Sequence, residues 1–134
     1  MRSKEFTKPK EPDFIEMLSK FLPLAMKELE ISKLPEIKLV KEVPDTAQPT
    51  FGKFVSDTGV IWLSIKDRHP LDIIRTLAHE LTHYKQDTEH QLDDQSGETG
   101  SPAENEAHAM AGIIMRHFNL KHPEYFNSQP VQLK

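Results

Sequence analysis

The spacing of apolar residues predicts three amphipathic helices along the chain. In the first, apolar residues recur three or four positions apart after Asp13: Phe14, Leu18, Leu22, Ala25 and Leu29. This period places them on one face of a helix, which we expect to pack on a sheet as part of the scaffold. Pro23 lies within the pattern and is expected to kink or divide the helix.

Strand patterns follow the first helix. The segment from Ile37 to Val43 is short and rich in β-branched residues, which predicts a strand that ends before Pro44. Segments 50–55 and 60–65 flank a turn in which Gly59 can adopt a positive φ, so we expect a β-hairpin. The second hairpin strand is apolar on both faces, which is typical of a central or covered strand.

The second helix is predicted over residues 71–88 and carries two histidines away from its apolar face. The residues of that apolar face are Ile73, Ile74, Leu77, Leu81 and Tyr84. His79 and His83 fall on the opposite side of the helix, together with Asp72 and Thr76. Histidines that served only the core would lie within the apolar face, so this placement favours metal binding.

A third helix is predicted from Pro102 to about Phe118, with Ser101 as its N-cap, after a polar loop at 89–100. Its apolar residues form a broad arc: Ala103, Ala107, Ala109, Met110, Ala111, Ile113, Ile114 and Phe118. Glu106 lies inside this arc, Glu104 at its edge and His108 outside it. Because a carboxylate that faces a core needs a partner or a metal, we expect Glu106 to have one.

The segment from His79 to His83 has the pattern His-Glu-x-x-His, in which two imidazoles one helical turn apart can bind the same metal ion. Two histidines and a glutamate are a standard ligand set for catalytic zinc, and Glu106 is the expected third ligand. Glu80 is then the expected general base, which activates a water molecule for attack on a carbonyl group. The other candidates for the third ligand are Glu104, His108 and Glu89.

Hydrolysis at such a site usually requires a second group that stabilises the oxyanion. Tyr125, His122 and His117 are candidates that the sequence does not rank, and each alone is more often structural. For His117 the favoured interpretation is a hydrogen-bonded histidine of the core or beside the ligands. Asp72 is a candidate partner for a metal-binding histidine, and a solvated surface aspartate is the alternative.

Composition limits the size and setting of the protein. The 134 residues are expected to form one domain, 1–134, with an arm at 1–11 and a C-terminal tail at 120–134. No apolar run is long enough for a membrane span, no secretory signal is recognisable and cysteine is absent, which together favour the cytoplasm. The net charge of −4 makes nucleic acid an unexpected partner, and the oligomeric state is left open.

The His-Glu-x-x-His helix followed by Glu104-Asn105-Glu106-Ala107 resembles the gluzincin branch of the zincin metallopeptidases. Residues 60–118 look like the compact minigluzincin and ImmA/IrrE kinds and like small phage proteins, so the compartment could be a host cytoplasm. The resemblance implies an α+β zincin-like fold and zinc-dependent hydrolysis of peptides or proteins. It also implies that the strand before the metal helix offers its edge to the substrate. Gln86 and Glu89 depart from the longer metzincin motif, and Met110 replaces the aspartate of larger gluzincins.

Two functions from different classes remain open at this stage. The favoured one is a zinc-dependent endopeptidase with His79, His83 and Glu106 as ligands and Glu80 as base. The alternative is a non-hydrolytic module in which zinc joins two helices and the protein serves a structural or regulatory interaction. The presence of Glu80 between the histidines favours the enzyme, because a structural site does not need it.

Overall fold

The computed structural model of the protein describes residues 14–44, 46, 50–89 and 100–132. The expected arm at 1–11 lies outside the described residues. So do most of the loop at 45–49 and most of the loop at 89–100. None of the described helices is both long enough and apolar enough to cross a membrane.

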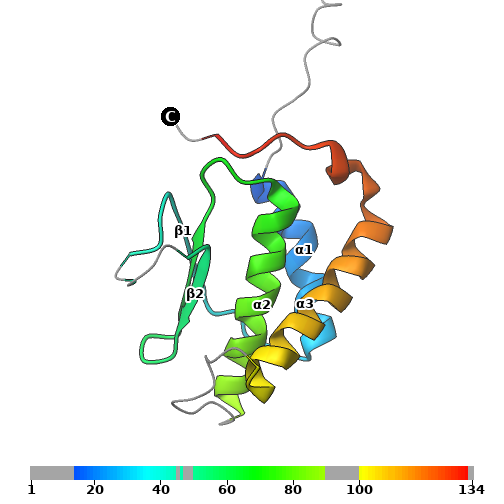
Figure 1. The fold of residues 1–134 in the computed structure, drawn as a ribbon. Coiled ribbons are helices and arrows are strands. Elements are labelled where there is room, and N and C mark those ends of the chain that lie inside the picture. Colours follow the sequence, from blue (N-terminus) through cyan, green and yellow to red (C-terminus); the bar gives the residue numbers. More distant parts are fainter. Residues whose placement is uncertain (1–13, 45, 47–49, 90–99, 133–134) are drawn as a thin grey trace, which may run out of the picture.

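The described residues form a small α+β fold, as expected, with a three-stranded sheet and helices packed on one side of it (Figure 1). Strand β1 (Glu36–Val40) runs parallel to β3 (Val60–Ser64), and β2 (Gly52–Val55) pairs with β3 on its other side in the antiparallel direction. The hairpin prediction is confirmed, and Gly59 has the expected positive φ, 70°.

The strand order β1-β3-β2 makes β3 the central strand. Both of its edges are therefore paired, which confirms the expectation from its apolar character. It also means that the edge expected to be offered to a substrate does not belong to β3. The free edge on the hairpin side belongs to β2, whose register places Phe54 opposite Ile61.

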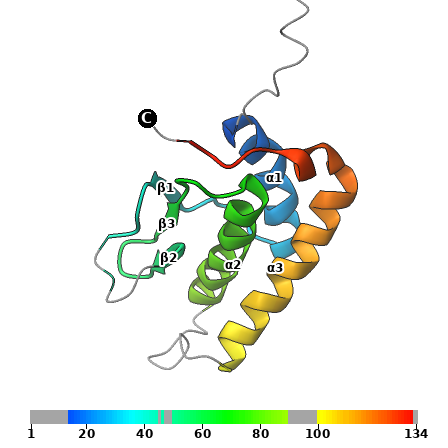
Figure 2. The same ribbon diagram turned by 45° about the horizontal axis from the view of Figure 1, so that its top comes forward.

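The fold contains three α-helices among the described residues, and α2 is the middle one. Helix α1 (Phe14–Leu29) runs without interruption through Pro23, so the proline does not divide it. Helix α2 (Pro70–Thr88) lies between the sheet and α3 (Pro102–Lys121) in both views (Figures 1 and 2). Helix α3 continues three residues past the predicted end and is followed by a 3-10 turn, η2 (Pro123–Asn127), in the expected tail.

The core confirms the predicted apolar face of α2 and corrects that of α3. Ile73, Ile74, Leu77 and Leu81 are fully buried, and Tyr84 packs against the same cluster. The buried stripe of α3 is narrower than the predicted arc and consists of Ala107, Ala111, Ile114, Met115 and Phe118. Ala109 and Ile113 are exposed instead. Because alanine is found both in cores and on surfaces, counting Ala109 as apolar shifted the predicted centre of the α3 face away from the buried stripe.

Arg68 joins the sheet to the first half of α2. Its Nη1 donates to the carbonyl oxygen of Ser64 at 2.7 Å, and its Nη2 donates to Thr76 Oγ1 at 2.8 Å. The guanidinium also lies 4.3 Å from the centre of the Phe51 ring. Burial lowers the pKa of Arg68, but the group stays charged because its ordinary pKa is so high. The end of β3, the residue before β2 and α2 are therefore held together by one side chain.

Strand β2 approaches α2 most closely at Gly52. A Cβ atom at this position would lie 2.4 Å from Thr76 Cγ2 and 3.4 Å from Glu80 Cγ. The Thr76 side chain cannot easily turn away, since its Oγ1 donates to the carbonyl oxygen of Asp72 and accepts from Arg68. A glycine is therefore needed for β2 to lie this close to Glu80.

We predict that Gly52→Ala lowers the free energy of unfolding by about 1–3 kcal/mol, the usual cost of forcing an extra methyl group into a packed interface. Urea denaturation monitored by circular dichroism measures the change. Gly112→Ala is the matched control, because a Cβ at Gly112 meets nothing within 4 Å and the residue lies inside α3. The control should gain about 0.5–1 kcal/mol from helix propensity. Equal effects of the two substitutions would contradict the close approach.

Candidate metal centre

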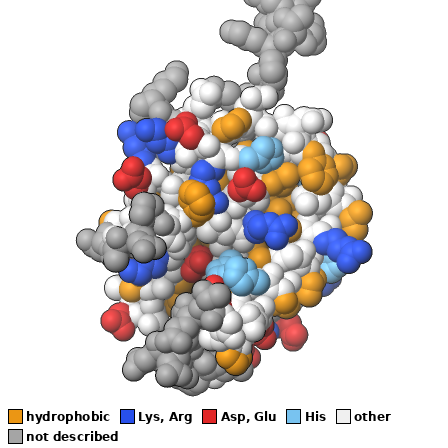
Figure 3. Space-filling view, viewed as in Figure 1, with side chains coloured by type: hydrophobic (Ala, Val, Ile, Leu, Met, Phe, Trp, Pro, Cys, Tyr) orange, Lys and Arg blue, Asp and Glu red, His pale blue; other side chains and the backbone are white. Residues whose placement is uncertain are grey.

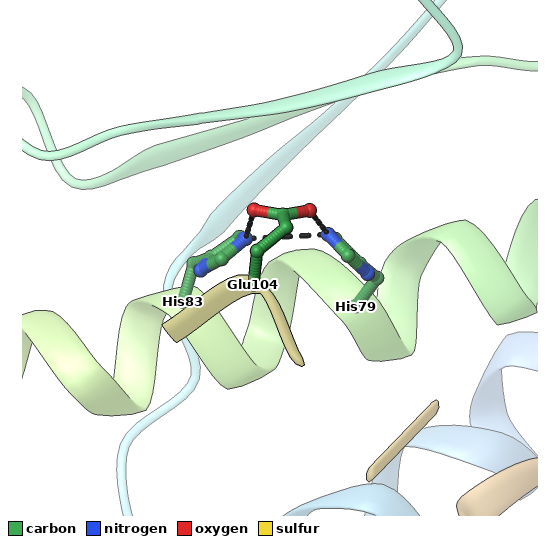
Figure 4. Close-up of side chains that lie close together, drawn as sticks. All are labelled: His79, His83 and Glu104. Carbon is green, nitrogen blue, oxygen red and sulfur yellow. Dashed lines mark hydrogen bonds and ion pairs between the residues drawn. The ribbon is translucent and has the colours of Figure 1, made fainter. Parts of the chain in front are cut away.

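Three side chains from two helices converge between α2 and α3 (Figure 4). His79 Nε2 lies 2.7 Å from Glu104 Oε1, and His83 Nε2 lies 3.1 Å from Glu104 Oε2. The two Nε2 atoms are 3.2 Å apart. His79, His83 and Glu104 therefore form a group that could hold a metal ion. Histidine side chains gather on the face of the molecule where α2 and α3 meet (Figure 3).

Local structure explains why these three side chains meet. His79 and His83 are one turn apart on α2 and so point in the same direction. Glu104 lies in the first turn of α3, where its backbone N–H donates to Ser101 Oγ, the predicted N-cap, at 3.1 Å. From there, Ala107 and Ala111 continue the same helical face and are buried, and their small side chains allow α3 to lie close to α2.

Gln86 fixes the orientation of the His83 ring. Its side-chain nitrogen donates to the carbonyl oxygen of Ala103 at 3.0 Å and to Glu106 Oε1 at 2.8 Å, both of which can only accept. Its Oε1 must then face His83 Nδ1, 2.8 Å away, so Nδ1 carries the proton. In the neutral form of the ring, the lone pair is therefore on Nε2, the atom that faces Glu104 and His79.

The donor set fits a small divalent cation. Two ligands of a tetrahedral zinc ion, each about 2.0–2.1 Å from the metal, lie about 3.3 Å apart. The Nε2 atoms of His79 and His83 are 3.2 Å apart, close to that value, and they lie 2.7 and 3.1 Å from the two different carboxylate oxygens of Glu104. Burial lowers the pKa of His79 despite the nearby Glu104 charge, which favours a neutral imidazole with a lone pair. Neutral imidazoles and a carboxylate this close repel one another unless a proton or a cation lies among them.

Glu80 directly follows His79 on α2, and its side chain reaches the edge strand β2. The side chain is 9% exposed, and its Oε1 accepts a hydrogen bond from the backbone N–H of Phe54 at 2.9 Å. Burial raises the pKa of Glu80 to about 7, although the nearby His83 and the hydrogen bond from Phe54 act to lower it. A carboxyl group with a pKa near neutrality can accept and release a proton with little cost in either direction.

Glu106, the expected third ligand, does not join His79 and His83 in the structure. Its side chain is exposed and accepts the hydrogen bond from Gln86. Glu104 takes the position near the histidines because it lies on the same helical face as the buried Ala107 and Ala111. Of the other candidates, Glu89 is exposed at the C-cap of α2, and His108 lies beside the group, with its Nε2 3.8 Å from Glu104 Oε1.

The three candidates for a second electrophile lie far from this group. Tyr125 stacks on Phe118, and the His122 ring packs against Phe118 at a tilt of 40°. Phe118 is 14 residues beyond Glu104 and therefore roughly 21 Å farther along α3. His117 pairs with Glu28 of α1, so it is hydrogen-bonded as expected, but its side chain is 46% exposed and lies neither in the core nor beside His79 and His83. Asp72 is exposed and lies two turns before His79 on α2, and the structure shows no contact of Asp72 with either histidine.

Gln86 has no supporting role in the sequence analysis, where it is only a departure from a longer motif. Its spacing of seven residues from His79 and three from His83 places it on the histidine face, and this spacing could have identified it. His108, an alternative third ligand from the sequence, is exposed as predicted, and its ring centre lies 4.6 Å from that of His79.

Comparison of the chain with protein-family models, with curated protein sequences and with solved structures gives no match. The chemistry of the site therefore has to be argued from its own donor atoms and their neighbours.

We predict that Gln86→Leu weakens metal binding by roughly 10–100-fold, the usual cost of removing the hydrogen-bond partner of a metal-binding histidine. The metal-free protein should also lose about 1 kcal/mol of unfolding free energy, because the partly buried His83 Nδ1 and Ala103 carbonyl group lose their hydrogen bonds to Gln86. Competition with a chromophoric chelator measures the affinity. Gln129→Leu is the matched control at an exposed position, and it should leave both quantities unchanged.

Glu104→Ala and Glu106→Ala distinguish the observed third donor from the expected one. Glu104→Ala removes a carboxylate that lies 2.7 Å from a histidine nitrogen, so metal stoichiometry should fall well below one per chain. Glu106→Ala removes only a partner of Gln86 and should keep the stoichiometry near one. Metal analysis of the purified variants decides the matter. The opposite result would restore Glu106 as the ligand.

Proposed function

We propose that the protein is a zinc-dependent peptidase of the zincin type, with His79, His83 and Glu104 as the zinc ligands. The observation that carries the proposal is the combination of this donor group with the buried carboxylate of Glu80. Two imidazoles and one carboxylate match a common ligand set of catalytic zinc, which leaves one coordination position open. When bound, zinc supplies Lewis acidity, which polarises a carbonyl group and lowers the pKa of a coordinated water toward about 7.

Glu80 is the general base in this proposal. Its Oε1 is engaged by the Phe54 N–H, so the second carboxylate oxygen accepts the proton of the attacking water. Glu80 then delivers that proton to the nitrogen of the departing amine, so that no net proton is gained or lost. The hydrogen bond from Phe54 holds the carboxylate in one orientation throughout both transfers.

The edge of β2 is the surface that suits an extended peptide substrate. The Phe54 N–H points away from β3 and is taken by Glu80, whereas the Phe54 carbonyl group, on the same side of the strand, is the group that a substrate N–H could pair with. An extended peptide can pair with the free edge of a sheet through main-chain hydrogen bonds. In this proposal the substrate pairs with the edge of β2 rather than with β3, the strand expected from the sequence. The proposed substrates are peptides or unfolded proteins.

A structural metal module is the second candidate. Its support is that the donors come from two helices, so a metal ion would join α2 to α3 and stabilise the fold. Glu80 argues against this candidate. Burying a carboxyl group costs free energy, and a structural site would gain nothing from a glutamate that is 9% exposed beside the metal ligands.

We predict that Glu80→Gln abolishes peptide hydrolysis, with a loss of roughly 10²–10⁴-fold or more, the usual contribution of a general base. Zinc stoichiometry and circular dichroism should stay unchanged, since glutamine keeps the acceptor for Phe54 N–H. The assay uses zinc-loaded protein and a panel of peptides and unfolded proteins. Glu36→Gln, at a side chain that is 62% exposed on β1, is the matched control and should keep full activity. Equal turnover by both variants would refute the role of Glu80.

A further inference from the structure

His108 lies where a fourth donor could reach the metal. It follows Glu104 by one turn of α3, and its Nε2 is 3.8 Å from Glu104 Oε1. Its ring contacts the edge of the His79 ring, with centres 4.6 Å apart and planes inclined by 60°. The side chain is 72% exposed, whereas the side chains of His79, His83 and Glu104 are 16%, 13% and 19% exposed.

We propose that His108 is a fourth, detachable protein ligand of the metal, which closes the open coordination position in the resting protein. The proposal rests on the metal site of the proposed function and adds a means of regulating access to it. Four protein ligands are typical of closed sites, and three protein ligands are typical of catalytic ones. Attachment and release of His108 would switch the site between these two states.

The helical spacing supports this assignment. His79 and His83 can share one metal because they are four residues apart on α2, and Glu104 and His108 have the same spacing on α3. The two helices thus present two pairs of donors to the same point. Coordination by His79, His83 and Glu104 uses both donors of the α2 pair and one of the α3 pair. His108 is the donor that is left.

The distances require only a movement of the side chain. Ligands of a tetrahedral zinc ion lie about 3.3 Å apart, and His108 Nε2 is 3.8 Å from one donor oxygen already. His108 is outside the group of three whose donor atoms lie within 4.8 Å of one another, so its ring must turn toward them. Because most of its surface faces solvent, this turn displaces little packing.

The same exposure makes His108 the ligand that can detach. The His83 ring is held by the hydrogen bond from Nδ1 to Gln86, and the Glu104 carboxylate lies within 3.1 Å of both His79 and His83. Release of either side chain would have to move a group that is no more than 19% exposed. Release of His108 exposes little new surface, so a water molecule or a substrate carbonyl can take its place.

Cobalt substitution and zinc affinity test this proposal on the full-length chain. We expect His108→Ala to weaken zinc binding by roughly tenfold or more, at least as much as the loss of a residue that only supports a ligand. The visible absorption of the Co²⁺-loaded protein should also change, because a water oxygen replaces an imidazole nitrogen among the four ligands. His117→Ala, which removes an imidazole from the same helix at a side chain that is 46% exposed, should change neither quantity.

Each other outcome has a clear meaning. Unchanged affinity and an unchanged cobalt spectrum in His108→Ala would overturn the fourth ligand. Weaker zinc binding with an unchanged spectrum would also overturn it, because His108 would then only support the ring of His79. In both cases, loss of metal from a His79→Ala variant would show that the three-ligand site still stands. If the unmodified chain binds no zinc, both the site and the fourth ligand are refuted.

Discussion

The close approach of electron-pair donors between α2 and α3 is the constraint on which the arrangement of the site depends. Atoms that each carry a lone pair or a negative charge are held about 3 Å apart, which is unfavourable unless something positive lies among them. Packing of α2 against α3 holds these atoms together despite the repulsion, and the buried small residues Ala107 and Ala111 belong to that packing. The three side chains are therefore already arranged so that they could hold a metal ion.

Helix α2 supplies the site from two of its faces. The histidines point toward α3, while Glu80 points toward the edge strand and accepts the hydrogen bond from Phe54. The sheet therefore controls the carboxylate that would move protons, and the helix pair controls the donors that would bind metal. Gly52 and Arg68 maintain the first of these relations, and Gln86 maintains the second.

Much of the fold could be predicted from periodicity, because long amphipathic segments bury their apolar faces in a predictable way. The helix with His79 and His83, the hairpin and the central position of β3 all followed from the sequence. Glu104 did not, since Ala109 could be placed on either side of a helix and drew the apparent centre of the face toward Glu106. Gln86 was missed for a related reason, as its importance lies in which hydrogen bonds it can satisfy once α3 is in place. The roles of Glu104 and Gln86 depend on how α3 packs against α2, which the residue pattern within a single helix does not contain.

The absence of cysteine has a consequence for which metal the protein would hold in a cell. A site built from imidazole nitrogens and a carboxylate oxygen has no thiolate with which to prefer one soft ion over another. Along the first-row series, copper binds such donors more tightly than zinc, and nickel and cobalt are close competitors. Selectivity would then come from the supply of each ion at the time of folding, so the metal found in the purified protein would reflect the host in which it was made.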